Sequence, residues 1–428
     1  MKTVDWNTLD AAGRDAVLAR PQMEKGGELE AIVAEIIANV RVNGDSALHE
    51  YSRRFDRAPV TALWQDVAER APLDPDLDRA LDRAIDTVRT FHARGRPDDY
   101  ALETAPGVNC RMRWLALEPV GLYVPAGSAP LPSTAIMLLV PALLAGCREI
   151  VLATPPNEHG RADDAVLAVA AKLGLARVLV SGGAQAIAAM AYGTETVPKC
   201  SKLFGPGNRF VAEAKRQVAL DVAGAAQDLP AGPSEVLVIA DQTANPEWVA
   251  IDLLSQAEHG PDSQVLLVTD STALGDAVQA EVQRLLETLS RGDTTRKALE
   301  HGAIVQVSEI NQAVAVSERY APEHLIIATR DAETVAEQIR TAGSVFVGHH
   351  TPESLGDYIS GTNHTLPTGG WARTTSGLGV VDFMRRMTLQ TATPAGLAEL
   401  GPAGARMAAA EGLDAHRLAI ELRLGGRS

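Results

Sequence analysis

Hydrophobic positions in the first quarter of the chain follow the spacing of a helix. Apolar residues recur every three to four positions within 29–42 and again within 77–91. Residues 6–20 form a shorter amphipathic segment. The pattern predicts a mostly helical region over residues 1–117.

From residue 121 onward the pattern changes to short apolar runs that alternate with amphipathic helices. Strands are predicted at 149–153, 177–180, 202–204, 235–240, 264–269, 303–307, 324–328 and 344–347. Helices are predicted at 163–173, 184–192, 208–218, 246–258 and 402–424. Strand–helix alternation is typical of parallel sheets covered by helices on both faces. Two such series predict two doubly wound α/β units.

The expected fold is therefore α/β, with two incomplete Rossmann-like doubly wound domains and small helical extensions at both ends. An N-terminal helical extension is expected over residues 1–23, and a Rossmann-like domain over 118–236. Residues 24–117 and 237–374 are expected to form one discontinuous α/β domain, and 375–428 a C-terminal segment.

Composition narrows the class of protein. The 428 residues carry 39 Lys and Arg against 54 Asp and Glu, a net charge of -15, which disfavours binding to nucleic acid or anionic lipid. The longest apolar run, 134–147, is interrupted by Pro141 and is too short to cross a bilayer. Cys110, Cys147 and Cys200 are few and widely spaced, which is typical of a reducing compartment. We expect a cytoplasmic, multi-domain enzyme.

Two glycine-rich turns follow predicted strands and precede predicted helices. They are Ser181–Ala184 and Gly205–Asn208. Backbone amides at such a helix start can bind a nucleotide phosphate. The second turn has Phe210 where the dinucleotide fingerprint requires glycine, so ordinary tight turns remain an equal alternative.

Histidines concentrate in the second half of the chain. Gln256 and His259 are three residues apart, so both can face one site, where Asp357 or Glu323 could complete a zinc shell. Glu323 and His324 are adjacent at a predicted strand start and could supply acid–base chemistry, although a surface loop is the simpler interpretation. A cysteine nucleophile is disfavoured, because no histidine lies near any of the three thiols in the sequence.

Seven segments together resemble the histidinol dehydrogenase family over nearly the whole chain. They are GLYVPAGSAP at 121–130, FGPGN at 204–208, DLPAGPSE at 228–235, LSQAEHGP at 254–261, YAPEH at 320–324, GTNHTLPT at 361–368 and EGLDAH at 411–416. The resemblance implies oxidation of L-histidinol to L-histidine through histidinal, with two NAD+ and one zinc per active site.

The resemblance also implies roles for individual residues. The implied zinc ligands are Gln256, His259, Asp357 and His416. The implied homodimer shares its sites, so His416 and Glu411 would reach the partner's site. Five-residue spacing would splay these two side chains on a continuous helix, and Gly412 is consistent with a break between them.

The remaining implied roles concern catalysis and binding. His324 would be the general base and Glu323 its partner, which activates water for the second oxidation. Ser234, His364 and Glu411 would hold polar groups of the substrate, alongside the metal ligands. The resemblance places Tyr123, Gln185 and Asn208 against NAD.

Three alternatives remain open. A relative of the same fold could oxidise another small alcohol, such as a sulfonated propanediol. A zinc hydrolase could use Glu323 to activate a metal-bound water. A non-enzymatic binding protein is the third.

Overall fold

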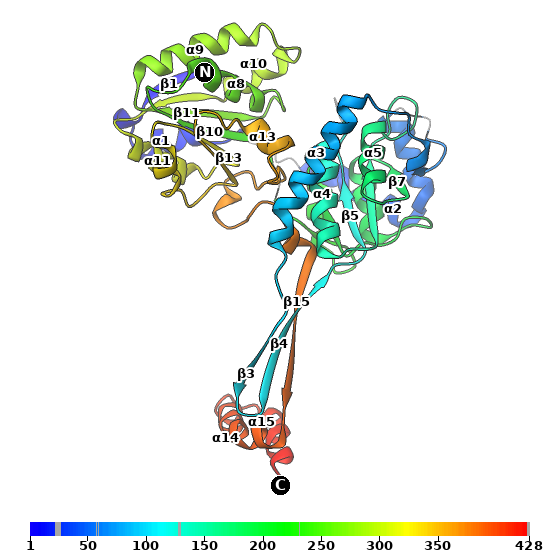
Figure 1. The fold of residues 1–428 in the computed structure, drawn as a ribbon. Helices are drawn as coiled ribbons and strands as arrows, with labels where there is room; N and C mark the ends of the chain where they lie inside the picture. The colour runs from blue at the N-terminus through cyan, green and yellow to red at the C-terminus, as the bar shows by residue number, and fades with distance from the viewer. Residues whose placement is uncertain (22–26, 57, 59, 127–129, 231, 426–428) are drawn as a thin grey trace.

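The computed structural model consists of two α/β lobes and a long β-arm that ends in the C-terminal helices (Figure 1). It describes the chain except residues 22–26, 57, 59, 127–129, 231 and 426–428. The expected boundary at 23/24 and parts of the 121–130 and 228–235 segments lie outside the described residues.

The first lobe is built on a six-stranded sheet in the order β2-β7-β6-β5-β8-β9. Its strands are β2 (Trp64–Asp66), β5 (Val120–Tyr123), β6 (Ile150–Thr154), β7 (Arg177–Val180), β8 (Lys202–Phe204) and β9 (Ala226–Gln227). Its helices are α2 (Gly27–Tyr51), α3 (Pro75–His92), α4 (Pro132–Ala145), α5 (Asp164–Lys172), α6 (Gly183–Tyr192) and α7 (Arg209–Leu220). Only β2 pairs antiparallel, and it lies at the edge. α4 is apolar on nearly all sides and is buried in the core.

The second lobe repeats this topology in the order β1-β12-β11-β10-β13-β14, with every strand parallel. Its strands are β1 (Lys2–Asp5), β10 (Glu235–Ala240), β11 (Gln264–Thr269), β12 (Ala303–Gln306), β13 (His324–Ala328) and β14 (Ser344–Val347). Its helices are α1 (Ala11–Leu18), α8 (Pro246–Ala257), α9 (Thr272–Leu286), α10 (Gly292–Glu300), α11 (Ile310–Tyr320), α12 (Ala332–Ala336) and α13 (Glu353–Tyr358). β10 and β11 are buried along their whole length, as expected of central parallel strands.

In each lobe the five strands that come from one continuous stretch take the order 3-2-1-4-5, one Rossmann half with an extra edge strand. The expected α/β fold class with two incomplete Rossmann-like units is confirmed. The predicted strands all form, with ends within one residue of the prediction.

The arm is a three-stranded antiparallel sheet of β3 (Tyr100–Ala105), β4 (Val108–Ala116) and β15 (Met384–Ala392). Nine-residue strands extend roughly 30 Å at about 3.3 Å per residue. At its tip lie α14 (Pro394–Ala410) and α15 (Asp414–Glu421) (Figure 1).

The structure corrects three expectations for the N-terminal quarter. Residues 1–117 are helical over more than half of their described length, but they are not helical throughout. They also contribute β1 to the second sheet and β3 and β4 to the arm. The 1–23 extension is likewise not purely helical. Residues 27–92 do not group with 237–374: β2 pairs with β7, and α2 and α3 pack into the core of the first sheet.

Candidate active site

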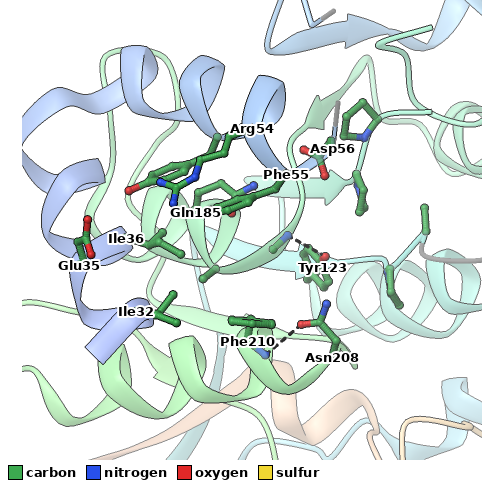
Figure 2. Close-up of a pocket in the computed structure, with 17 residues that line it drawn as sticks. Ile32, Glu35, Ile36, Arg54, Phe55, Asp56, Tyr123, Gln185, Asn208 and Phe210 are labelled. Carbon is green, nitrogen blue, oxygen red and sulfur yellow. Dashed lines mark hydrogen bonds between the residues drawn. The ribbon is translucent and has the colours of Figure 1, made fainter. Parts of the chain in front are cut away.

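A pocket of about 700 Å³ opens at the carboxyl ends of β5, β6, β7 and β8, where open α/β sheets bind ligands. Tyr123, Gln185 and Asn208, the three residues expected to contact NAD, all line it (Figure 2). The other lining residues are Ile32, Glu35, Ile36, Tyr51, Arg54, Phe55, Asp56, Pro125, Ala126, Pro155, Pro156, Gly183, Ala184 and Phe210.

Two of the predicted contact residues also organise helix starts in this pocket. The Tyr123 hydroxyl accepts a hydrogen bond from the Gly183 N–H at 3.0 Å, at the first residue of α6. Asn208 is the N-cap of α7, and its side-chain oxygen accepts from the N–H groups of Phe210 and Val211. Burial raises the pKa of Tyr123 to about 12, so the phenol stays neutral.

The glycine turn before Asn208 is held by a buried ion pair. Lys215 Nζ donates to the Gly205 carbonyl at 2.9 Å, and Asp228 accepts from the Gly205 N–H at 2.7 Å. Lys215 and Asp228 also pair with each other. Gly205 has a φ of +116°, and a Cβ there would lie 2.1 Å from the Tyr123 carbonyl oxygen, so only glycine fits this turn.

Glu323 and His324 lie side by side at the amino end of β13 and are buried. Nδ1 of His324 is 3.2 Å from the Glu235 carbonyl oxygen and 3.7 Å from Glu323 Oε2. Its Nε2 is buried, has no hydrogen-bond partner among the described residues and lies 3.6 Å from Asp357 Oδ1. The expectation of a plain surface loop is therefore wrong for this pair.

Carboxylates surround the imidazole of His324. Glu353 and Asp357, four residues apart on α13, lie with it in a cluster whose ligand atoms are all within 4.8 Å. Burial raises the pKa of Glu323 to about 8 and that of Glu353 to about 8. Burial alone would lower the pKa of His324, but Glu353, Glu323 and Asp357 outweigh it and raise the pKa to about 10.

Such a concentration of carboxylates with an unpartnered imidazole nitrogen fits a bound cation. Glu353 was missed by the sequence analysis, although its i, i+4 spacing to Asp357 could have placed both on one helix face. Burial would raise the pKa of Asp357, yet His324 lowers it, as do His364 and His259.

The predicted metal ligand Gln256 lies in the last turn of α8, and His259 follows just after the helix ends. Gln256 is buried, and the amide orientation that satisfies both ends directs its nitrogen to Glu353 and its oxygen to the Glu235 N–H, 3.0 Å away. His259 is exposed, and its Nδ1 lies 3.0 Å from the Ser255 carbonyl oxygen. His259 and Asp357 are close enough for their charges to interact. Whether these residues bind metal stays a prediction.

His364 connects the two lobes beside this cluster. Its Nδ1 is 2.8 Å from the Asp357 carbonyl oxygen, and its Nε2 is 3.2 Å from Oγ1 of Thr134 on α4. Ser234 immediately precedes β10 and is partly exposed. Both therefore belong to segments that border the cluster.

Glu411 and His416 lie at the far end of the arm and are exposed (Figure 1). α14 ends at Ala410 and α15 begins at Asp414, with Gly412 at a φ of +71° between them. The predicted helix break is confirmed. Neither residue joins the cluster around His324 in its own chain.

The cysteines are all unpaired. Cys147 and Cys200 are buried, and burial raises the pKa of their thiols to about 11 and about 12. A thiolate nucleophile is not available at either position near neutral pH.

Two Rossmann-type units, a nucleotide-sized pocket and a buried acid–base pair define the class of NAD-dependent oxidoreductases. The family model described as histidinol dehydrogenase matches residues 18–424. The chain is 53% identical to the histidinol dehydrogenase of Xanthomonas euvesicatoria pv. vesicatoria, covering 99% of both, and 50% identical to that of Idiomarina loihiensis, covering 99% and 97%. The crystal structure of histidinol dehydrogenase from Elizabethkingia anophelis superposes with a TM-score of 0.94 at 42% identity, covering 99% and 98%.

The chain belongs to the histidinol dehydrogenase family. The family is NAD-dependent and acts in histidine biosynthesis, and the comparisons give no support to a relative acting on another alcohol. Among the described residues, no helix has the length and apolarity needed to span a bilayer.

Proposed function

We propose that the protein oxidises L-histidinol to L-histidine through histidinal, with His324 as general base. The main support is the buried Nε2 of His324, which lies among carboxylates and has no hydrogen-bond partner in the part of the chain that the structure describes. Overall, one histidinol, one water and two NAD+ give one histidinate, two NADH and three protons.

In the first step, Nε2 of His324 accepts the alcohol proton while hydride leaves the carbinol carbon for NAD+. The second step needs the hydrated aldehyde. Glu323, whose pKa is raised to about 8, can exchange a proton with the water that adds to histidinal. His324 first releases the alcohol proton to solvent and then accepts a proton from the hydrate as the second hydride leaves for the second NAD+.

Zinc is the proposed metal, with Gln256, His259, Asp357 and the partner's His416 as ligands. When bound, it would anchor the amine and imidazole nitrogens of the substrate. The buried carboxylates support this proposal, because they offer oxygen ligands whose charged forms are disfavoured by burial and would be stabilised by a bound cation. A nearby positive charge would also lower the pKa of His324 toward the range of a working base.

Ser234, His364 and Glu411 are the proposed contacts to polar groups of histidinol. His364 supports this role by its position, because it contacts both lobes beside Asp357. Tyr123, Gln185 and Asn208 are the proposed contacts to NAD, and they share the pocket at the carboxyl edge of the first sheet.

A homodimer with shared active sites is proposed as the working form. Glu411 and His416 lie at the end of the arm, so within one subunit they are separated from the second lobe (Figure 1). Met407, Leu413 and Leu422 near the same tip are exposed apolar side chains that a partner would bury.

The test is the amount of NADH formed per L-histidinol consumed by purified protein, with and without a zinc chelator. We expect two NADH per histidinol, loss of activity on chelation and recovery with zinc. One NADH per histidinol would contradict the second oxidation. Full activity in metal-free protein would contradict the metal requirement. Absence of NADH from folded, zinc-loaded protein would overturn the proposed substrate.

A further inference from the structure

Glu235, the first residue of β10, contacts both members of the catalytic pair through its backbone. Its N–H donates to Glu323 Oε2 at 2.8 Å, and its carbonyl oxygen lies 3.2 Å from Nδ1 of His324. With Nδ1–H donating to this carbonyl, the neutral imidazole carries its lone pair on Nε2. The position of one peptide unit thus determines which nitrogen of His324 is free to accept a proton.

The side chain of Glu235 is fixed by Arg20, 215 positions earlier in the chain. Arg20 Nε donates to Oε1 at 2.5 Å and Nη2 to Oε2 at 3.0 Å, the parallel two-bond geometry of a guanidinium–carboxylate pair. The Gly369 N–H also donates to Oε1, at 2.7 Å. Only 3% of the Glu235 side chain is exposed, so the carboxylate is shielded from water, while 25% of the Arg20 side chain is exposed.

Arg20 also supports the turn that leads into β13. Nη2 donates to the carbonyl oxygens of Tyr320 at 2.8 Å and Ala321 at 3.3 Å, and the guanidinium lies 4.0 Å from the centre of the Tyr320 ring. Ala321 has a φ of +53°. Among the described residues, it is the only one other than glycine with a positive φ. A left-handed alanine is strained and persists only where its surroundings hold it.

Arg20 therefore contacts the two segments that bear the catalytic pair, the start of β10 and the turn before β13. We propose that Arg20 is a positioning residue for catalysis: through Glu235 and the Tyr320–Ala321 turn, it holds Glu323 and His324 in reactive geometry. The inference rests on the proposed function. Arg20 contacts no residue of the cofactor pocket, so its removal acts on the chemical step rather than on the binding of NAD.

The test compares Arg20→Ala and Arg20→Lys with Arg14→Ala as the matched control. Arg14 lies in α1 of the same N-terminal segment and likewise packs over an aromatic ring, that of Trp6, but it contacts neither Glu235 nor Tyr320. Steady-state kcat and KM are measured for histidinol and NAD+, together with zinc content, melting temperature and rescue by sub-denaturing guanidinium.

We expect Arg20→Ala to lower kcat about 10- to 100-fold with KM for NAD+ within about twofold of wild type. Free guanidinium should restore part of the lost kcat, because it can occupy the vacated site beside Glu235. Lysine keeps the charge but not the two-bond fork, so Arg20→Lys should remain impaired. Arg14→Ala should keep the wild-type kcat.

Three outcomes would overturn the inference: a wild-type kcat in Arg20→Ala, a loss confined to KM, or a loss in folded protein that guanidinium leaves unchanged. If Arg20→Ala does not fold, Arg20→Lys decides, and a wild-type kcat in that variant rejects the role. Failure of the wild-type protein to oxidise histidinol would reject the proposed function instead.

Discussion

At the scale of single residues, the active site is distinguished by side chains in surroundings that oppose their usual charge. Burial raises the pKa of Glu323 and Glu353, and carboxylates raise that of His324. These shifts follow from contacts between residues far apart in the chain. The role of each such residue can be tested by substituting it and measuring activity or stability.

The first prediction separates two roles for His324. The cluster geometry allows it to ligate a cation with Glu353 and Asp357, whereas the proposed mechanism uses it as a base. We expect His324→Ala to lower kcat at least about a thousandfold while one zinc per subunit is retained. Metal analysis alongside kinetics decides, and loss of zinc from the folded variant would make His324 a ligand.

The second prediction concerns Asp56, whose pKa burial raises from 3.8 to about 6. The folded state binds this proton more tightly than the unfolded state. The stabilisation by the protonated form is therefore complete below about pH 4 and is lost as pH rises through about 6. Asp56→Asn does not titrate, so its melting temperature relative to wild type should be higher at about pH 8 than at about pH 4.5. Asp98→Asn, at an exposed position, is the control for the effect of the substitution itself. An equal shift at both pH values for Asp56→Asn would contradict the burial effect.

At the scale of elements, the glycine turn between β8 and α7 depends on the buried pair of Lys215 and Asp228. Removing one partner leaves a buried charge uncompensated. We expect Lys215→Met to lower the free energy of unfolding by about 3 kcal/mol and to raise KM for NAD+, because Asn208 follows this turn. Chemical denaturation and kinetics measure the two effects.

Arg216→Met is the matched control on the same helix. Arg216 pairs with Glu213 and Glu30 at the surface, so its loss should cost less than about 1 kcal/mol. Equal stability losses in Lys215→Met and the control would show that the buried pair does not hold the turn. If Lys215→Met is destabilised but keeps the wild-type KM for NAD+, the turn does not contribute to cofactor binding.

Sequence patterns identified eight of the parallel strands, because strands such as β10 and β11 are apolar throughout and lie between helical patterns, but they did not identify β1, β5 or β9. They did not identify β3, β4 and β15. Nearly every residue of β3 is exposed, so it lacks the alternation of a half-buried strand, whereas β4 does alternate from Val108 to Trp114 and this signal was overlooked. Helical periodicity correctly predicted α2 and α3, but it carries no information on which sheet they cover.

Only part of the candidate site could be predicted, because many of its contacts join residues that are far apart in the sequence. Adjacency suggested Glu323 with His324, spacing suggested Gln256 with His259, and the family resemblance supplied most of the other candidates. Arg20 and Glu235 were not recognised as partners, since nothing local connects positions 215 apart. Glu353 was missed because the sequence alone did not show that the short helix α13 faces His324.

At the scale of the whole molecule, the arm separates Glu411 and His416 from the lobe that carries His259 (Figure 1). If each site combines the lobe of one subunit with the arm tip of the other, a His416→Ala subunit still provides an intact lobe. A His259→Ala subunit still provides an intact arm tip. Each homodimer should be nearly inactive. A heterodimer should contain one intact site of two, and random mixing should restore about a quarter of wild-type activity.

Differently tagged subunits allow the heterodimer to be isolated after co-expression, where about half of wild-type activity is expected. Combining both substitutions in one subunit is the control with the opposite expectation, because its heterodimer with wild type carries one substituted histidine in each shared site and should be nearly inactive. Inactive heterodimers of the single variants, beside active control heterodimers, would mean that both histidines serve the same subunit's site. The arm would then have to fold back on its own lobe, against the extended arrangement of β3, β4 and β15.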